Sequence, residues 1–395
     1  MKKLIYAVWA GLLSGFAASL FLISLAWVSE FRNTHSYLVY GLPFSGLVIG
    51  YLYHLYGREI QPGTNLIIDE IHNPQKVLPL RMAPLIYFAT LLTHLFGGSA
   101  GREGTAVQMG ASLSDQLSLI FKIPVAERKT LLLCGMGSAF GAAIGAPFAG
   151  VFFGMEIVRA GKIHRKPEAL LECALASVAA YTVTRICHAS HLAYPHFSNL
   201  AFSWREAAGL LISTLLFAFI VRSFVWLTHR IESFHAKMVK YPPLRPFIGG
   251  ILLLLLFTLL PWQGFEGLGL ETIFASFQTP QDFSVFAIKL LLTALTLGSG
   301  FKGGEFIPLV FMGATSGSAL SGVLQLDPQL LASLGFVAVF GAAAKAPLTC
   351  SILAVELFGW SIAPYAIIAC YLSAFLSGNF SIYRVKSKSE HGLSR

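Results

Sequence analysis

Long apolar runs divide this sequence, and they constrain its fold more than any other feature. Several of them approach or exceed the length of about 20 residues that a helix needs to cross the hydrocarbon layer of a membrane. These runs lie at residues 4–28, 37–56, 82–96, 207–227, 247–261 and 283–297. Charged residues make up 12% of the chain, whereas about a quarter of the residues in soluble domains are charged. With 55% hydrophobic residues and a mean hydropathy of +0.68, the sequence predicts an all-α polytopic membrane protein.

Other apolar stretches are too short or too rich in glycine to cross a membrane cleanly. Such segments are typical of broken and tilted helices that end inside the protein, where they line a cavity. Residues 97–105, GGSAGREGT, place Arg102 and Glu103 between two predicted membrane helices. Residues 303–308, GGEFIP, place a second acid, Glu305, far along the chain. Because ionisable side chains at membrane depth are costly, these two segments predict an ion site built from two broken helices.

The two halves of the chain share a motif. Residues 140–147, FGAAIGAP, match residues 340–347, FGAAAKAP, at six of eight positions and an offset of 200. Glu156 and Glu356 follow at the same offset. Many membrane transporters consist of two structural repeats with the substrate site at their interface. We therefore predict one membrane domain over residues 1–383, with a first repeat at about residues 1–190 and a second at about 200–383.

Positive charge in the sequence indicates topology. Basic residues concentrate at Lys2 and Lys3 and in residues 162–166, 230–245 and 384–395, so the positive-inside rule predicts that both termini are cytoplasmic. No signal-peptide cleavage pattern follows the first apolar run. We therefore expect this run to remain as the first helix of a multi-pass protein in the cell (inner) membrane. The net charge of +9 is explained by this topology and does not indicate nucleic-acid binding. The five cysteines lack metal-ligand spacing, so we expect no metal and no cofactor.

Glu103 is the predicted gate of the site. A helix that begins at Glu103 directs the free N–H groups of its first turn, and its dipole, toward the glycine-rich loop, and a helix that begins near Glu305 does the same. Two such ends hold an anion without a full positive charge. Glu103 competes for this position when ionised and leaves it when protonated, which couples protons to anion movement. The alternative is a plain helix-capping glutamate.

Two further segments supply candidate donors. Residues 62–68 contain a break and then a short helix, at whose start Thr64 and Asn65 can donate to an anion or serve as ordinary N-caps. Tyr383 follows the last apolar run, where a tyrosine is usually an interfacial anchor. Arg102 can bind the anion, pair with a carboxylate or extend to the surface. Glu156 and Glu356 can relay protons or face the cytoplasm, and the sequence leaves their roles open.

Residues 101–104, GREG, resemble the gating motif of the CLC family of chloride channels and anion/proton antiporters. The chain is similar to that family also in Gly304-x-Phe306-x-Pro308, in Tyr383 as the anion-facing tyrosine and in its two-repeat plan. The resemblance implies inverted repeats, a homodimer with one pore per subunit, and Glu103 as the residue that gates the pore and carries protons. Together with the reasoning above, it leads us to predict an anion site formed by Thr64, Asn65, Gly101, Arg102, Gly104, Phe306, Ile307 and Tyr383, with Glu305 as a second acidic site.

Departures from the chloride members point to the fluoride/proton antiporter branch of that family. Thr64 stands at the chloride-coordinating serine, Thr105 replaces the proline after the gating motif, and Glu305 replaces an apolar residue. The glutamate that carries protons on the inner side of chloride exchangers would align with Ile157 of this chain. Glu156, one residue earlier, is therefore a possible inner proton relay. We expect no CBS domain, because only a short cytoplasmic tail of residues 384–395 follows the membrane domain.

These observations predict a fluoride/proton antiporter that exports fluoride, and hence a secondary active transporter and no enzyme. Its partners would be fluoride or chloride ions, protons, the lipid bilayer and a second copy of the chain. The alternative within transport is a chloride channel or chloride/proton exchanger of the CLC family. An intramembrane enzyme that uses a histidine with Glu103 or Glu305 is a third hypothesis. Against it, His94 lies a helix away in an apolar run, and no metal-binding H-E-x-x-H pattern occurs.

Overall fold

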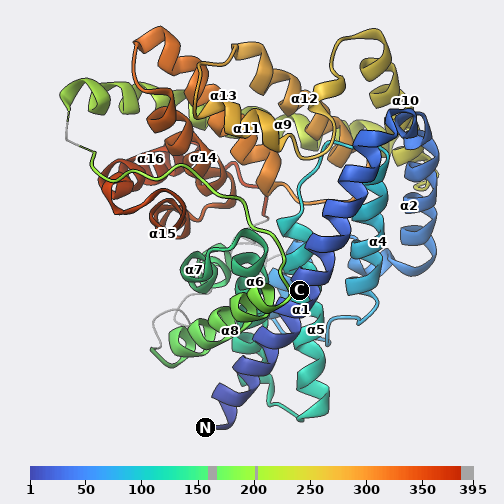
Figure 1. Ribbon diagram of the computed structural model, residues 1–395. Helices are drawn as coiled ribbons and strands as arrows, with labels where there is room; N and C mark the ends of the chain where they lie inside the picture. Colours follow the sequence, from blue (N-terminus) through green and yellow to red (C-terminus); the bar gives the residue numbers. More distant parts are fainter. Residues whose placement is uncertain (159–166, 201–202, 384–395) are drawn as a thin grey trace, which may run out of the picture.

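The computed structural model describes residues 1–158, 167–200 and 203–383, and across these ranges the chain is helical with no strand. Figure 1 shows helices of very different lengths, many of them tilted against one another. The α-helices are α1 (Lys2–Thr34), α2 (Leu42–Tyr56), α3 (Thr64–His72), α4 (Met82–Leu95), α5 (Glu103–Ile120), α6 (Val125–Ile144), α7 (Pro147–Val158), α8 (Pro167–Ile186), α9 (Trp204–Met238), α10 (Leu244–Leu259), α11 (Leu270–Ser276), α12 (Phe283–Gly298), α13 (Phe306–Leu324), α14 (Pro328–Ala344), α15 (Pro347–Phe358) and α16 (Ala363–Leu376). Short 3₁₀ helices are η1 (Ser36–Gly41), η2 (Arg58–Ile60), η4 (Gln263–Phe265) and η5 (Trp360–Ile362). The predicted basic run 162–166 and the predicted tail 384–395 lie outside the described residues.

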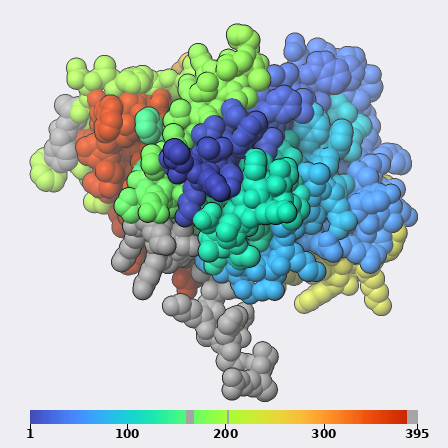
Figure 2. Space-filling model, turned by 90° about the horizontal axis from the view of Figure 1, so that it is seen from below, coloured from blue at the N-terminus to red at the C-terminus, as the bar shows by residue number. Residues whose placement is uncertain are grey.

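The side chains of α1 are distributed as expected for a helix between lipid and protein. Many of its large apolar residues, Trp9, Phe16 and Trp27 among them, are exposed, whereas most of its small residues are buried together with Phe21 and Leu25. A Cβ atom on Gly15 would lie 2.6 Å from the Ala180 carbonyl oxygen of α8, so the two backbones can approach only because glycine stands there. In Figure 2 the first turns of α1, in dark blue, lie on the face seen from below. The helix thus packs closely against α8 through its small residues, and it presents large apolar residues such as Trp9, Phe16 and Trp27 outward.

Within the described residues, five helices are long and apolar enough to cross a membrane: α1, η1 with α2, α8, α9 and α13. The spanning helices α8 and α13 were not among the runs predicted from sequence; in α8, Glu168, Glu172 and Arg185 interrupt the apolar pattern. Three of the predicted runs instead form the shorter helices α4, α10 and α12, of 14, 16 and 16 residues. Several other helices, such as α7 and α15 with 12 residues each, are too short to span alone. The predicted mixture of spanning and broken helices is confirmed.

The structure also confirms the internal repeat. Helices α5, α6 and α7 correspond in order to α13, α14 and α15, and their lengths are 18, 20 and 12 residues against 19, 17 and 12. The two phenylalanines that open the shared motif, Phe140 and Phe340, face one another with ring centroids 6.0 Å apart and planes 17° apart. Equivalent residues of the two halves thus meet at the centre of the molecule.

Helices α7 and α15 pack against each other in opposite directions. Near the end of α7, the Glu156 carboxylate accepts bonds from the N–H groups of Leu348 and Thr349 at the start of α15, at 2.9 and 2.7 Å. Near the end of α15, the Glu356 carboxylate accepts bonds from the N–H groups of Phe148 and Ala149, at 2.9 and 2.6 Å. Because each helix ends where the other begins, the pair is antiparallel, as expected for inverted repeats.

Candidate functional site

The two glycine-rich clusters meet through their backbones. The Gly101 N–H donates to the Gly304 carbonyl oxygen at 2.6 Å, and the Gly304 N–H donates back to the Gly101 oxygen at 2.8 Å. A Cβ atom on Gly101 would lie 2.9 Å from the Gly304 oxygen, and one on Gly304 would lie 2.7 Å from the Gly104 nitrogen. Any side chain would force these loops apart, so glycine is required at the crossing. The two segments predicted to form one site do lie together.

Glu103 is the first residue of α5, and its carboxylate folds back over the start of that helix. Oε2 accepts a bond from the Arg102 N–H at 3.3 Å, and Oε1 accepts one from Arg102 Nε, also at 3.3 Å. Glu103 is 1% exposed and Arg102 9%. The carboxylate therefore occupies the positive N-terminal end of α5, where an anion would otherwise bind. The helix start at Glu103 is confirmed, and Arg102 pairs with this carboxylate.

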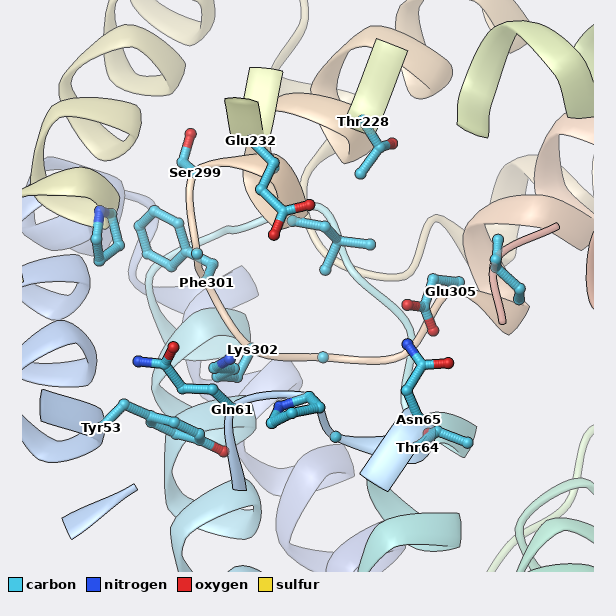
Figure 3. A pocket seen from close by; sticks show the side chains of 18 of the residues that line it. Tyr53, Gln61, Thr64, Asn65, Thr228, Glu232, Ser299, Phe301, Lys302 and Glu305 are labelled. Atoms are coloured by element: carbon cyan, nitrogen blue, oxygen red, sulfur yellow. The ribbon is translucent and has the colours of Figure 1, made fainter. Parts of the chain in front are cut away.

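Glu305 is the N-cap of α13 and lines a cavity of about 430 Å³, which we name the α3 cavity. In Figure 3 the side chains of Asn65 and Glu305 point toward one another, with Thr64 close to Asn65. The polar and charged residues of its lining are Tyr53, Gln61, Thr64, Asn65, Gln108, Thr228, His229, Glu232, Arg245, Ser299, Lys302, Glu305 and Tyr383. The cavity thus combines hydroxyl and amide donors with two acids and several bases.

Helix α3 begins at this cavity because the chain breaks directly before it. Gly63 has φ of 58°, a conformation that favours glycine, and α3 starts at the next residue. Thr64 and Asn65 are the first residues of α3 and line the cavity, as Glu305 does at the start of α13. Two helix N-termini, each with free N–H groups and a partial positive charge, are therefore directed at one cavity.

Tyr383 reaches the α3 cavity from the segment that follows α16. The Ile382 N–H donates to the Ala343 carbonyl oxygen at 3.0 Å, which fixes this segment to the end of α14. Tyr383 is 7% exposed and lines the cavity. This position differs from that of an interfacial anchor, which would face the headgroup region.

The other predicted anion ligands do not line the α3 cavity in the described chain. Phe306 and Ile307, 2% and 1% exposed, contribute only the first-turn N–H groups of α13, which lack an acceptor within the helix. The Gly101 N–H already donates to the Gly304 carbonyl oxygen, and the anion-binding role of Gly101 stays a prediction. Gly104 and Gly101 instead allow close approach, since a Cβ atom on Gly104 would lie 3.0 Å from the Gly304 Cα.

Sequence reasoning did not identify Lys302 as a site residue. Its ammonium nitrogen lies 4.3 Å from the centre of the Tyr53 ring, and both residues line the α3 cavity. Lys302 is the only cation within the loop between α12 and α13. A signal was present, because Lys302 directly precedes the Gly303-Gly304 pair and is itself a charge at membrane depth.

A second cavity, of about 1030 Å³, lies where α1 ends and α11 begins, and we name it the α11 cavity. Arg32 and Glu266 line it and form an ion pair of 3.5 Å. The two cavities lie at opposite ends of α2, since Tyr53 lines the α3 cavity and Tyr40 lines the α11 cavity. A helix of 15 residues is about 22 Å long, so a membrane-scale distance separates them. The Gly101–Gly304 crossing connects the two regions.

His94 is closer to the site than its position in the sequence suggested. It lines the α11 cavity, and its Nε2 lies 3.4 Å from the Gly101 carbonyl oxygen. After α4 ends at Leu95, the chain turns at Gly97, which has a positive φ, and brings Gly101 back against the imidazole ring of His94. Across the described ranges no group of three or more His, Cys, Asp or Glu residues could hold a metal ion.

Glu156 was a possible inner proton relay, and its surroundings favour another role. Both of its carboxylate oxygens accept bonds from the start of α15, one of them also from the Thr349 hydroxyl at 2.7 Å. Glu356 makes the matching contacts with α7. A carboxylate that caps a helix N-terminus stabilises it whether or not a proton pathway is near.

Together, these features define a class of membrane transport protein in which inverted repeats join at broken helices. The family described as voltage-gated chloride channel matches residues 45–378. Over 391 residues the chain is 39% identical to a chloride/fluoride channel protein of Pseudomonas syringae pv. tomato, covering 98% of this chain and 86% of the relative. The chain therefore belongs to the voltage-gated chloride channel (CLC) family.

Solved structures agree with this assignment. The crystal structure of a CLC-type fluoride/proton antiporter superimposes with a TM-score of 0.92 at 32% identity, covering 97% of this chain and 96% of the other. A slow cyanobacterial Cl⁻/H⁺ antiporter, at 19% identity, shares the fold with a TM-score of 0.82. The H⁺/Cl⁻ exchange transporter ClcA of Vibrio parahaemolyticus is 27% identical over 385 residues, covering 90% of this chain and 81% of the relative.

Proposed function

We propose that this protein is a fluoride/proton antiporter that exports fluoride at the expense of the proton gradient. The observation that carries the proposal is the position of Glu103, whose carboxylate covers the N-terminus of α5 at the crossing of the two repeats. An acid placed there competes with an anion for the same N–H groups. The likeness to a fluoride/proton antiporter along nearly the whole chain supports the choice of substrate.

The α3 cavity is the proposed anion site. Thr64, Asn65 and Tyr383 line it and supply hydroxyl and amide donors. Phe306 and Ile307 do not line it, and we propose that they act as first-turn residues of α13, whose N-terminal end Glu305 brings to the cavity. Fluoride is small and holds its water tightly, so a selective site needs short, strong hydrogen bonds to replace that water. No lysine or arginine has to contact the ion directly, which leaves it free to depart.

Glu103 is the proposed exchange group. When ionised, it keeps its place over the start of α5 and excludes an anion from that end of the path. When protonated, it loses the charge that the helix N-terminus attracts, and the anion can take its place. Glu305, at the equivalent end of α13, is the second acid that holds a proton or a fluoride ion in transit. Arg102 fixes the Glu103 carboxylate through its Nε.

The proposed topology is based on the lysines at the start of α1. We place both termini in the cytoplasm and the protein in the cell inner membrane, since Lys2 and Lys3 begin α1. The α11 cavity, at the other end of α1, then faces outward, and the α3 cavity faces the cytoplasm. We further propose one membrane domain over residues 1–383, repeats at about 1–190 and 200–383, and a homodimer in the bilayer.

A chloride channel or chloride/proton exchanger is the second candidate. The observation in its favour is the likeness to proton/chloride exchange transporters over most of the chain. Both alternatives differ from the fluoride/proton antiporter in the anion selected at Thr64 and Glu305, and a channel differs also because its anion flow moves no protons.

Purified protein in liposomes separates these functions. We expect an outward fluoride gradient to drive protons inward, measured by a fluoride electrode and an internal pH dye, and an equal chloride gradient to drive far fewer. Anion flow without proton movement would indicate a channel. Chloride and proton movement without fluoride movement would indicate the exchanger.

A further inference from the structure

Coupled exchange requires a proton route from outside water to Glu103, and this route has a gap. Glu103 is 1% exposed and lines neither the α3 cavity nor the α11 cavity. Water in the α11 cavity therefore does not contact the carboxylate directly. A side chain that both lines that cavity and contacts the loop before Glu103 would bridge the gap.

His94 meets both conditions. It lines the α11 cavity, is 1% exposed, and its Nε2 lies 3.4 Å from the oxygen of Gly101, two residues before Glu103. Because a carbonyl oxygen only accepts hydrogen bonds, this contact requires the proton to be on Nε2. Nδ1 is then a bare acceptor, and it is buried without a hydrogen-bond partner among the described residues. A buried acceptor left unpaired is costly, and a functional role accounts for its retention.

We propose that His94 passes protons between the α11 cavity and Glu103. This inference rests on the proposed antiport and assigns a residue to its outer proton step. A histidine suits this task because its ring has a nitrogen on each side, so one can accept a proton while the other releases one.

The step conserves protons. A hydronium ion in the α11 cavity gives a proton to Nδ1 and becomes water. The imidazole, now protonated on both nitrogens, releases the Nε2 proton. The Glu103 carboxylate accepts that proton and becomes a neutral acid, and His94 is left with its proton on Nδ1 until the ring returns to the starting tautomer.

Charged groups surround His94 on every side. Arg32 from α1, Lys289 from α12 and Arg102 from the loop before α5 act on the ring as nearby cations. Lys289 is held by the carbonyl oxygens of Phe265 and Gly267, at 3.1 and 2.7 Å. Glu266 lines the same cavity and pairs with Arg32. Burial of the ring and, after it, these cations disfavour the charged form of His94, so the doubly protonated ring is only a transient state of the proposed route.

The test measures fluoride-driven proton uptake by proteoliposomes while external pH is varied and internal pH is constant. His94→Gln keeps an N–H donor for the Gly101 oxygen but cannot titrate. We expect proton uptake to be about tenfold slower and its dependence on external pH to flatten, because water alone offers a slower route than a positioned proton-transfer group. Fluoride affinity, measured by calorimetry on the same protein, should stay unchanged.

His35→Gln is the matched control, because His35 lies at the same end of the molecule and does not line the cavity. It should keep the rate and pH profile of the wild type. His94→Leu gives a second variant without a titrating group. A His94→Gln protein with the wild-type rate and external-pH profile would refute the relay alone. Wild-type protein that moves fluoride without protons would refute both the antiport and the relay.

Discussion

At the residue scale, Glu305 is the acid that lies within the proposed anion site. It stands at the start of α13, faces Asn65 and shares the α3 cavity with Lys302 (Figure 3). Most acids in membrane helices pair with a base or serve a transport path. Its position among the donors of the proposed anion site favours the transport path.

Glu305→Gln should therefore slow fluoride/proton exchange about tenfold, because the amide cannot take up or release a proton. Glu232→Gln provides the control, since Glu232 lines the same cavity but is exposed, and its loss should change turnover less than twofold. Turnover is measured as initial fluoride efflux from liposomes. Unaltered turnover of Glu305→Gln would remove Glu305 from the transport path.

At the scale of elements, the reciprocal caps of α7 and α15 hold the inverted repeats together. Each carboxylate accepts two backbone N–H groups of the opposite repeat, and these contacts join helices that are otherwise too short to be stable alone. The near-identity of the two arrangements indicates a structural role for Glu156 and Glu356.

Glu156→Ala and Glu356→Ala should each destabilise the protein by about 1 to 2 kcal/mol, because each leaves helix N–H groups without their acceptors. Thermal unfolding in detergent measures this effect, and fluoride/proton coupling in liposomes should persist in both variants. Loss of coupling in Glu156→Ala, with coupling retained in Glu356→Ala, would instead support the inner relay.

Local sequence was sufficient for the helix starts at the site. Glycine breaks followed by polar residues predicted the beginnings of α3, α5 and α13, because capping and helix dipoles act within one turn. Contacts between distant segments were not predictable in this way. The bond from Gly101 to Gly304 and the cap of α15 by Glu156 depend on how the repeats dock, and the contact of His94 with Gly101 depends on the turn between them.

At the scale of the whole molecule, the two cavities lie at opposite ends of the path through the repeat crossing. Among residues that line them, Gln61 is exposed in the α3 cavity and Gln263 in the α11 cavity. The family resemblance and the two-repeat plan were predicted from sequence. The existence and separation of these cavities were not, because they are spaces left by packing.

The proposed topology makes a direct prediction about these two positions. In a protein with Cys187 replaced by serine, Gln61→Cys should react with an impermeant thiol reagent from the cytoplasmic side and Gln263→Cys from the outer side. The other four cysteines are buried and provide a low background. Labelling is compared between right-side-out and inverted vesicles. The reverse pattern would show that the orientation proposed here is wrong.

The most direct test of the account concerns Glu103, which is proposed to exchange places with the anion as it gains or loses a proton. The measurement is the proton movement that accompanies a fluoride gradient in liposomes that contain Glu103→Ala protein. We predict that fluoride still flows through the vacated N-terminus of α5 and that no protons move with it. Protons that move against their gradient in step with fluoride in this variant would contradict the central claim.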